Sequence, residues 1–229
     1  MTLRSDVLEQ LGTVYDPELD QPISTLGFVS SCSVSADGDV SVRLRLPTPQ
    51  CAPNFAYLMA ADARAAVRRL PQVREVSVVL EDHYTGAEIN AAIAGDAGFD
   101  GAFPGETDER DLDALRELFQ RKALLARQAR LCGTLLAAGA SPEAVVALRV
   151  GDLPDADEEA VRCIELRAAL GLPHDRDAPA LIAGDGTALD AGDLRTWLRR
   201  ARLVSLSLET NGGMCRDLLR VRYGEEVAA

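Results

Sequence analysis

Two stretches in the N-terminal part of the chain alternate apolar and polar residues. They are residues 23–35 (ISTLGFVSSCSVS) and 40–46 (VSVRLRL), and the turn-forming sequence Ala36-Asp37-Gly38-Asp39 separates them. A period of two is typical of a half-buried β-strand, and Asp and Gly favour tight turns. The pattern therefore predicts a β-hairpin over residues 23–46.

Helical spacing is found on both sides of this hairpin. The first helix has Ser5 as its expected cap and ends near Asp16-Pro17, and its apolar face holds Val7, Leu8, Leu11 and Val14. The second has Asn54 as its expected cap and stops at Pro71. Residues 73–80 (VREVSVVL) alternate again and predict a third strand. The order α-β-β-α-β predicts an α/β fold of the α+β kind for residues 1–94.

The rest of the chain has a different pattern. Residues 95–111 are dense in Gly and acidic residues and are predicted to form a linker. Residues 112–229 are predicted to form a second, mainly α-helical domain. Its expected elements are helices over 112–138, from Ser141-Pro142 onward, over 157–170, 190–201 and 213–222, and a strand over 203–209 (LVSLSLE).

Composition narrows the possible functions. The 229 residues carry a net charge of −12, so nucleic acid and anionic membranes would be repelled at long range. We therefore expect neither as a partner. The N-terminal residues lack the pattern of a signal peptide, which predicts a cytoplasmic protein. The five cysteines form no Cys-x-x-Cys pair, which argues against a zinc ribbon or a disulfide framework.

The first candidate functional residues lie in the stretch LRLPTPQCAPN, residues 44–54. Cys51 lies between a strand and the first turn of a helix, where free N–H groups and the helix dipole favour a thiolate. Thr48 is placed to hydrogen bond to that thiolate. Such a thiol suits a nucleophile or a metal ligand, but a free cysteine is also often a small buried apolar residue. Asp16 and Glu18 (VYDPELD) are a second pair of candidate functional residues. The alternative is that they form a solvated turn.

These motifs resemble those of a known family. The sequences VYDPELDQPISTLGFV, VSVRLRLPTPQCAP and VREVSVVLEDHYTGAEI are similar to the metal–sulfur cluster assembly family, the PaaD/SufT-like domain, over residues 5–93. Two departures stand out. Cys51 is followed by Ala52 before Pro53, where the family usually has Cys-Pro, and Tyr84 replaces a usual Trp.

The resemblance implies a maturation factor that assists iron or iron–sulfur insertion into a client protein, and not an enzyme. Cys51 would be its reactive centre, with Asp16 and Glu18 beside it, and would bind iron or a cluster transiently. Because a cluster usually needs four protein ligands, a homodimer, another protein or Cys32 must complete the site. His83 is a further candidate ligand. The alternative for Cys32 is a structural role, and the alternative for His83 is that of a hydrogen-bonded surface group.

The second half offers less specific signals. Residues 138–202 weakly resemble the helical region of phage-type recombinases, which raises the possibility of a DNA-binding regulator. The activating His-x-x-Arg pair is missing, however, and acidic residues outnumber basic ones. We therefore interpret this half as a scaffold for protein contacts.

The C-terminal stretch ETNGGMCRDLLRVRYG is more distinctive. Asn211 is expected in a turn and Cys215 near the start of a helix, with Arg216 and Arg220 on one face. These residues form either a solvated basic face or a docking or ligand site. The whole layout resembles accessory proteins of bacterial multicomponent di-iron monooxygenases, which implies an oxygenase subunit as the client metalloprotein. A metal-free chaperone or adaptor for the same client is the alternative.

Overall fold

The computed structural model describes residues 2–105 and 109–224. The chain divides into two compact units. The first comprises Met1–Leu115 together with Thr210–Ala229, and the second comprises Arg116–Glu209. The C-terminal residues therefore fold with the N-terminal part of the chain, whereas the sequence groups them with the helical domain.

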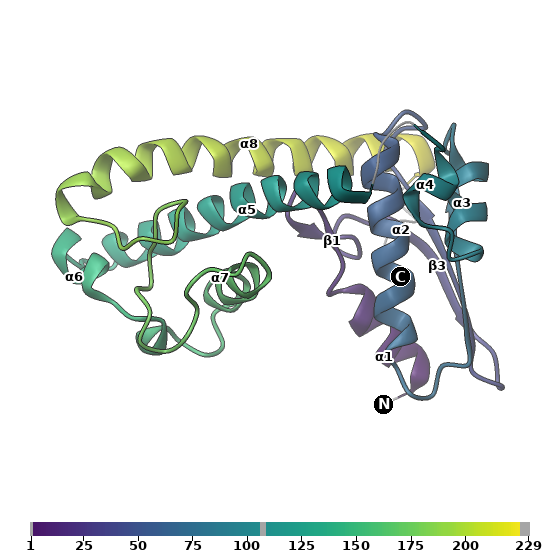
Figure 1. The fold of residues 1–229 in the computed structure, drawn as a ribbon, viewed down its shortest axis with the longest axis horizontal. Coiled ribbons are helices and arrows are strands. Elements are labelled where there is room, and N and C mark those ends of the chain that lie inside the picture. Colours follow the sequence, from purple (N-terminus) through teal and green to yellow (C-terminus); the bar gives the residue numbers. More distant parts are fainter. Residues whose placement is uncertain (1, 106–108, 225–229) are drawn as a thin grey trace. The chain divides into compact units, whose positions relative to one another are not determined.

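The first unit has the predicted mixed α/β character. Figure 1 shows its helices beside a small sheet. In chain order its elements are α1 (Leu3–Leu11), β1 (Tyr15–Asp16), β2 (Gln21–Pro22), β3 (Val29–Val34), β4 (Asp39–Arg45), α2 (Pro53–Arg68), β5 (Glu75–Glu81), α3 (Gly86–Ala94) and α4 (Gly98–Ala102). The predicted order α-β-β-α-β is confirmed, with a short extra hairpin, β1–β2, inserted after the first helix.

The main sheet has the strand order β3-β4-β5. β3 and β4 form the predicted antiparallel hairpin, while β5 pairs in parallel with β4 after the α2 crossover. Parallel pairing places the carboxyl ends of β4 and β5 at the same edge, with Arg45 opposite Glu81. The segments that follow these two strands, from Leu46 and from Asp82, therefore start side by side.

The core lies on one face of this sheet. Side chains on alternate positions of β4 and β5 are buried, namely Val40, Val42, Leu44, Val78 and Leu80. They pack with the apolar face of α2, which includes Met59, Ala63 and Val67. The strand alternation and the helical stripe in the sequence thus meet in one hydrophobic cluster.

The predicted helix starts were displaced. α2 starts at Pro53 with Ala52 as its N-cap, so the expected cap Asn54 lies inside the first turn. Proline fits the first helical position because it lacks an N–H that would be unpaired there. At α1 the Thr2 side chain accepts a hydrogen bond from the backbone N–H of Ser5, so the cap precedes the predicted one.

The segment predicted as a linker, residues 95–111, is folded over part of its length. It contains α4, and Phe99, Ala102 and Phe103 are buried in the core of the first unit. The Phe99 ring packs edge-on against Tyr57, with 5.2 Å between ring centroids. Gly and acidic residues dominate the composition of this stretch, but its two aromatic side chains decide its position.

The second unit is helical, as predicted. It contains most of α5 (Glu109–Ala137), α6 (Pro142–Ala147), a 3-10 turn (Val150–Asp152), α7 (Glu158–Ala169) and the first part of α8 (Ala191–Tyr223). Ser141 caps α6 through a hydrogen bond from the N–H of Ala144. None of the helices in the described part of the chain is long and apolar enough to cross a membrane.

The predicted strand over 203–209 is wrong. These residues belong to α8, which continues through the turn expected at Gly212-Gly213 to Tyr223. Ser205 and Leu208 are buried while Leu203 and Leu206 are exposed, which is a helical spacing. The alternation of Leu and Ser in LVSLSLE therefore does not reflect a strand. Packing along the helix determines the structure of this segment.

A buried arginine organises the second unit. The Arg167 side chain is 1% exposed and donates hydrogen bonds to the carbonyls of Pro179 and Ala180 and to Oε1 of Gln128. That same oxygen accepts a bond from the N–H of Ile182, at 2.8 Å. Burial lowers the pKa of Arg167 below its usual range. The guanidinium therefore holds the irregular segment around residues 179–182 against α5 and α7.

We predict that Arg167→Met destabilises the protein by about 2–4 kcal/mol, because methionine fills the space but leaves buried carbonyls without a donor. Arg220→Met is the control, since Arg220 forms an exposed i,i+3 ion pair with Asp217 and should cost less than about 1 kcal/mol. Urea unfolding measures both. Equal costs for the two variants would contradict a structural role for the buried bonds.

Candidate functional site

The loop between β4 and α2 carries the predicted thiol. Cys51 immediately precedes the N-cap of α2 and is partly buried against the core. Its backbone N–H donates to the carbonyl of Thr48 at 3.4 Å, and Oγ1 of Thr48 lies 3.6 Å from Sγ of Cys51. The contact expected between the threonine and the thiol is therefore present, and it forms within one tight turn.

The segment after β5 supports this loop. Nε2 of His83 lies 2.7 Å from the carbonyl oxygen of Cys51, which requires the proton on that nitrogen. Nδ1 accepts bonds from the N–H and the hydroxyl of Thr85, at 3.3 and 3.1 Å. The N–H of Tyr84 donates to the carbonyl of Pro49. Both ring nitrogens of His83 are thus occupied by protein partners, and metal binding by His83 would require one of these bonds to break.

The acidic motif forms the β1–β2 hairpin. Oδ1 of Asp16 accepts bonds from the N–H groups of Glu18 and Leu19, at 2.8 and 2.9 Å. Asp16 is 6% exposed, whereas Glu18 lies at the surface. Burial raises the pKa of Asp16 from its ordinary value of 3.8 to about 6, and the neighbouring Glu18 adds to the rise against the two hydrogen bonds. A solvated turn would not hold a carboxyl in this way.

The last turns of α8 pack beside this hairpin. Arg216 donates a hydrogen bond to Oε1 of Gln21, the residue paired with Asp16 in the β1–β2 ladder. One turn earlier, the backbone at Gly212 lies against the amide end of the Gln21 side chain. Two successive turns of α8 therefore contact the same residue of the acidic hairpin.

The end of α8 is anchored to the other two segments of the site. Arg222 donates to the carbonyl of Leu46 at 3.5 Å and to Oδ2 of Asp82 at 2.6 Å. The hydroxyl of Tyr223 donates to the same carboxylate at 3.0 Å, and the Arg45 guanidinium lies 4.8 Å from the Tyr223 ring centroid. The tail of α8 is therefore fixed at the start of the thiol loop and at the residue before His83.

Cys215 lies on this docked part of α8. The expectation that it sits near a helix start is wrong, because α8 begins at Ala191. Burial raises the pKa of the Cys215 thiol to about 11, and the negative charges of Asp16, Cys51 and Glu18 add to the effect, while Arg216 opposes it. The Cys51 region and the C-terminal stretch, which are far apart in the sequence, thus lie side by side in the first unit.

Other predicted residues lie away from this site. Cys32 is in the middle of β3, opposite Val42 of β4, and is three strand residues, or about 10 Å, from the edge where the thiol loop begins. Burial raises the pKa of its thiol. Arg220 forms an exposed ion pair with Asp217, and Asn211 lies at the surface. Within the C-terminal stretch, Cys215 and Arg216 are the two predicted residues that face the acidic hairpin.

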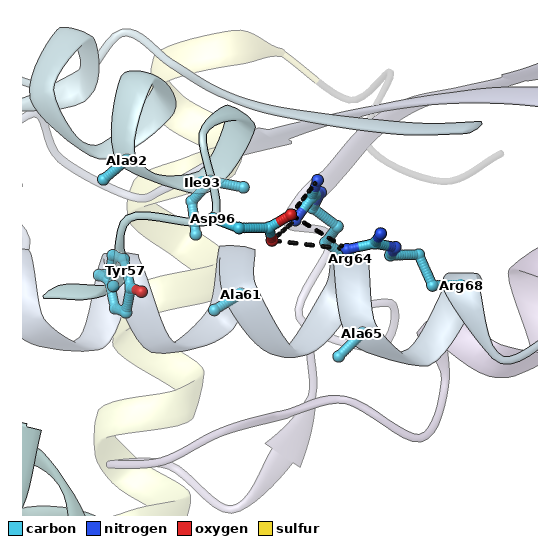
Figure 2. A pocket seen from close by; sticks show the side chains of 9 residues that line it. Tyr57, Ala61, Arg64, Ala65, Arg68, Ala92, Ile93 and Asp96 are labelled. Carbon is cyan, nitrogen blue, oxygen red and sulfur yellow. Dashed lines mark hydrogen bonds and ion pairs between the residues drawn. The ribbon is translucent and has the colours of Figure 1, made fainter. Parts of the chain in front are cut away.

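A pocket in the first unit is separate from these residues. It has a volume of about 250 Å³ and lies between α2 and the segment α3–α4. Figure 2 shows the Asp96 carboxylate between Arg64 and Arg68, and the Arg64 hydrogen bond holds the pKa of Asp96 below its usual range. None of Asp16, Thr48, Cys51 and Cys215 lines this pocket. We interpret its ion pairs as a link between the helices.

The site is not a closed metal cage. Over residues 2–105 and 109–224, no three His, Cys, Asp or Glu side chains are grouped so as to hold a metal ion. A cluster commonly needs four protein ligands. Any iron or cluster at Cys51 would therefore need further ligands from other residues or another molecule.

Comparison with known proteins agrees with this geometry. Residues 4–78 match the model of the family described as iron-sulfur cluster assembly protein. An uncharacterised protein of Methanocaldococcus jannaschii is 34% identical over 90 residues, which cover 93% of its length and 39% of this chain. The chain belongs to the iron-sulfur cluster assembly protein family. A relative from Porphyromonas gingivalis, named as an Fe-S protein maturation auxiliary factor, is 35% identical over 75 residues, covering 70% of its length and 33% of this chain.

Several residues that shape the site were missed from the sequence. Gln21, Asp82, Gly212 and Arg222 join the tail of α8 to the family domain, but the sequence gives Gln21 and Asp82 no role and places Gly212 in a turn. A signal was present for α8, because residues 212, 216, 219 and 223 recur at helical spacing. No sequence pattern links them to Gln21 or Asp82, whose partners lie more than 100 positions away.

We predict that Asp16→Asn increases stability at neutral pH and not in acid. The folded-state pKa of about 6 exceeds the ordinary value of 3.8, so stability falls as pH rises between these values and the loss is complete above about pH 6. Asparagine keeps the oxygen that accepts both backbone bonds and removes the buried charge. The expected gain is about 2–3 kcal/mol at pH 7.5.

Urea unfolding of both proteins at about pH 4 and pH 7.5 measures this difference. At the lower pH the two should have nearly the same stability, because the native carboxyl is then protonated. A variant that is less stable at pH 7.5, or a gain that does not change with pH, would contradict a buried and perturbed Asp16.

Proposed function

We propose that this protein is a maturation factor that receives iron or an iron–sulfur cluster at Cys51 and helps its insertion into a client metalloprotein. The observation that carries the proposal is that the tail of α8 contacts both the acidic hairpin, through Gln21, and the start of the loop that carries Cys51, through Leu46, in a family domain for iron–sulfur cluster assembly. The protein acts as a carrier in the cytoplasm and does not turn over a substrate.

The electrostatics of the site support a cationic cargo. Burial is the main cause of the raised pKa of Cys215, and the negative charges of Asp16, Cys51 and Glu18 add to it, so these three groups disfavour a further anion and favour a cation. A soft thiolate beside carboxylates suits iron. Thr48 and His83 act as positioning residues, because one contacts the sulfur and the other holds the carbonyl of the same cysteine.

We infer that the client is a component of a multicomponent di-iron monooxygenase. The support is the resemblance of the sequence layout, in which a family domain is followed by a helical second half and a distinctive C-terminal stretch, to accessory proteins of such enzymes. The carboxylate-bridged hydroxylase and its iron–sulfur reductase are the two candidate subunits. The ligands that this chain does not supply come from the client or from a second copy in a homodimer.

Co-expression with the client tests the role of the thiol. With Cys51→Ala, the iron content and activity of the purified client should fall to the level seen without the factor, because the cargo loses its soft ligand. Cys32→Ala is the matched control and should leave client loading unchanged, since Cys32 lies in β3 away from the loop. Full client loading with Cys51→Ala would refute the proposed role.

A metal-free adaptor is the second candidate function. It is favoured by the lack of a grouping of three metal-ligating side chains among the described residues. In this function the first unit would present the client to a separate cluster donor, and Cys51 would act within a protein–protein contact.

Anaerobic reconstitution separates the two functions. The full chain is incubated with ferrous iron and sulfide, desalted, and examined by absorption spectroscopy and iron analysis. A carrier should retain iron and show sulfur-to-iron charge-transfer bands that Cys51→Ala abolishes. If no iron is retained while the client still binds in a pull-down, the adaptor is the correct function.

A further inference from the structure

The docked face of α8 is defined by its contacts. Gly212 and Arg216 meet Gln21, Leu219 is 2% exposed within the first core, and Arg222 and Tyr223 reach Asp82. These positions follow the spacing of a single helical face. Cys215 follows Gly212 by three residues and precedes Leu219 by four, so it lies on the same face.

The opposite face of the same turns is exposed. Met214, Leu218 and Val221 are 57%, 42% and 86% exposed. Most of the apolar side chains of the tail therefore point to solvent, while a cysteine and two arginines point toward the family domain. Hydrophobic burial alone would favour the reverse arrangement. The polar contacts and Gly212 thus determine which side of α8 faces the site.

The anchors of α8 lie on the three segments that carry the site. Gln21 belongs to the acidic hairpin, Leu46 begins the thiol loop, and Asp82 precedes His83. Cys215 lies between the turn that contacts Gln21 and the turn that contacts Leu46 and Asp82. It is therefore held over the region enclosed by these segments, within electrostatic reach of Cys51.

From this placement we infer that Cys215 is the second thiol of the site, so that α8 and the loop bind a thiophilic metal ion or cluster between Cys51 and Cys215. The inference rests on the proposed function and extends it, because it assigns a ligand from outside the matched residues 4–78. On binding, each thiol releases its proton to solvent and its sulfur donates to the metal. Two thiolates occupy half of a tetrahedral coordination sphere and leave the other half to sulfide, water or client ligands.

Binding by two thiolates leaves one side of the bound metal ion or cluster open for transfer. A cluster held by two thiolates on one side keeps its other side available to an acceptor protein. Because one of the two ligands lies on a helix tail held by hydrogen bonds and by the buried Leu219, movement of α8 would withdraw one sulfur and weaken the site. Release of the cargo then requires the tail to undock and not the unfolding of the domain.

Cobalt binding to the full chain tests the inference without a client. Anaerobic titration with Co²⁺ reports thiolate ligands through sulfur-to-metal charge-transfer absorption. The wild-type protein should show this band. Cys215→Ser and Cys51→Ser should each lose about half of its intensity and at least tenfold in affinity, as expected for loss of a direct ligand. The double variant should show no band.

Cys32→Ser is the matched control for thiol removal, because Cys32 is also a partly buried cysteine of the first unit. It should titrate like the wild type. If Cys215→Ser also titrates like the wild type, in intensity and in affinity, the inference is overturned. Circular dichroism of each variant checks that the fold is retained.

The maturation role of Cys51 and the ligand role of Cys215 can be refuted separately. If Cys51→Ala leaves client loading intact, the proposed function fails whatever the cobalt spectra show. If Cys51→Ala abolishes client loading but Cys215→Ser binds cobalt as the wild type does, the maturation role stands and Cys215 is not a ligand.

Discussion

The parallel pairing of β4 with β5 is the constraint on which the site depends. It brings the carboxyl ends of the two strands to one edge of the sheet, so the thiol loop and the His83 segment begin as neighbours. The α2 crossover that makes this pairing possible also begins directly after Cys51. The bond from His83 to the carbonyl of Cys51 and the bond from Tyr84 to Pro49 follow from that arrangement. One topological feature thus positions the thiol, its helix and its support.

The site contains a buried carboxyl group, Asp16, that lowers the stability of the fold, and hydrogen bonds that offset part of this cost. Burial of Asp16 raises its pKa to about 6, so its ionised form costs folding free energy at neutral pH. The hairpin offsets part of this cost with two backbone hydrogen bonds to the carboxyl. The tail of α8 adds Arg216 beside the hairpin and Arg222 at Asp82. A buried carboxyl group with a raised pKa is typical of functional sites.

The sequence predicted the family domain well because its signals are local. The strand alternation of residues 40–46, the helical stripe after Asn54 and the Thr48–Cys51 turn each involve residues a few positions apart. Prediction was poorer where long-range packing competes with local pattern. Residues 203–209 alternate like a strand and form a helix, and the Gly-rich stretch with Phe99 and Phe103 folds into the core. In both cases the burial of particular side chains outweighed composition.

By itself, the sequence determined the order of the elements in the family domain, the thiol at the start of α2 and the acidic turn before the hairpin. These follow from periodicity, capping and turn chemistry, which act over a few residues. The tertiary structure alone decided that the C-terminal tail folds with the N-terminal domain and that Cys215 lies within electrostatic reach of Cys51. That outcome depends on Gln21 and Asp82 meeting residues at the other end of the chain. Such contacts have no local signature, because they arise when packing brings distant segments together.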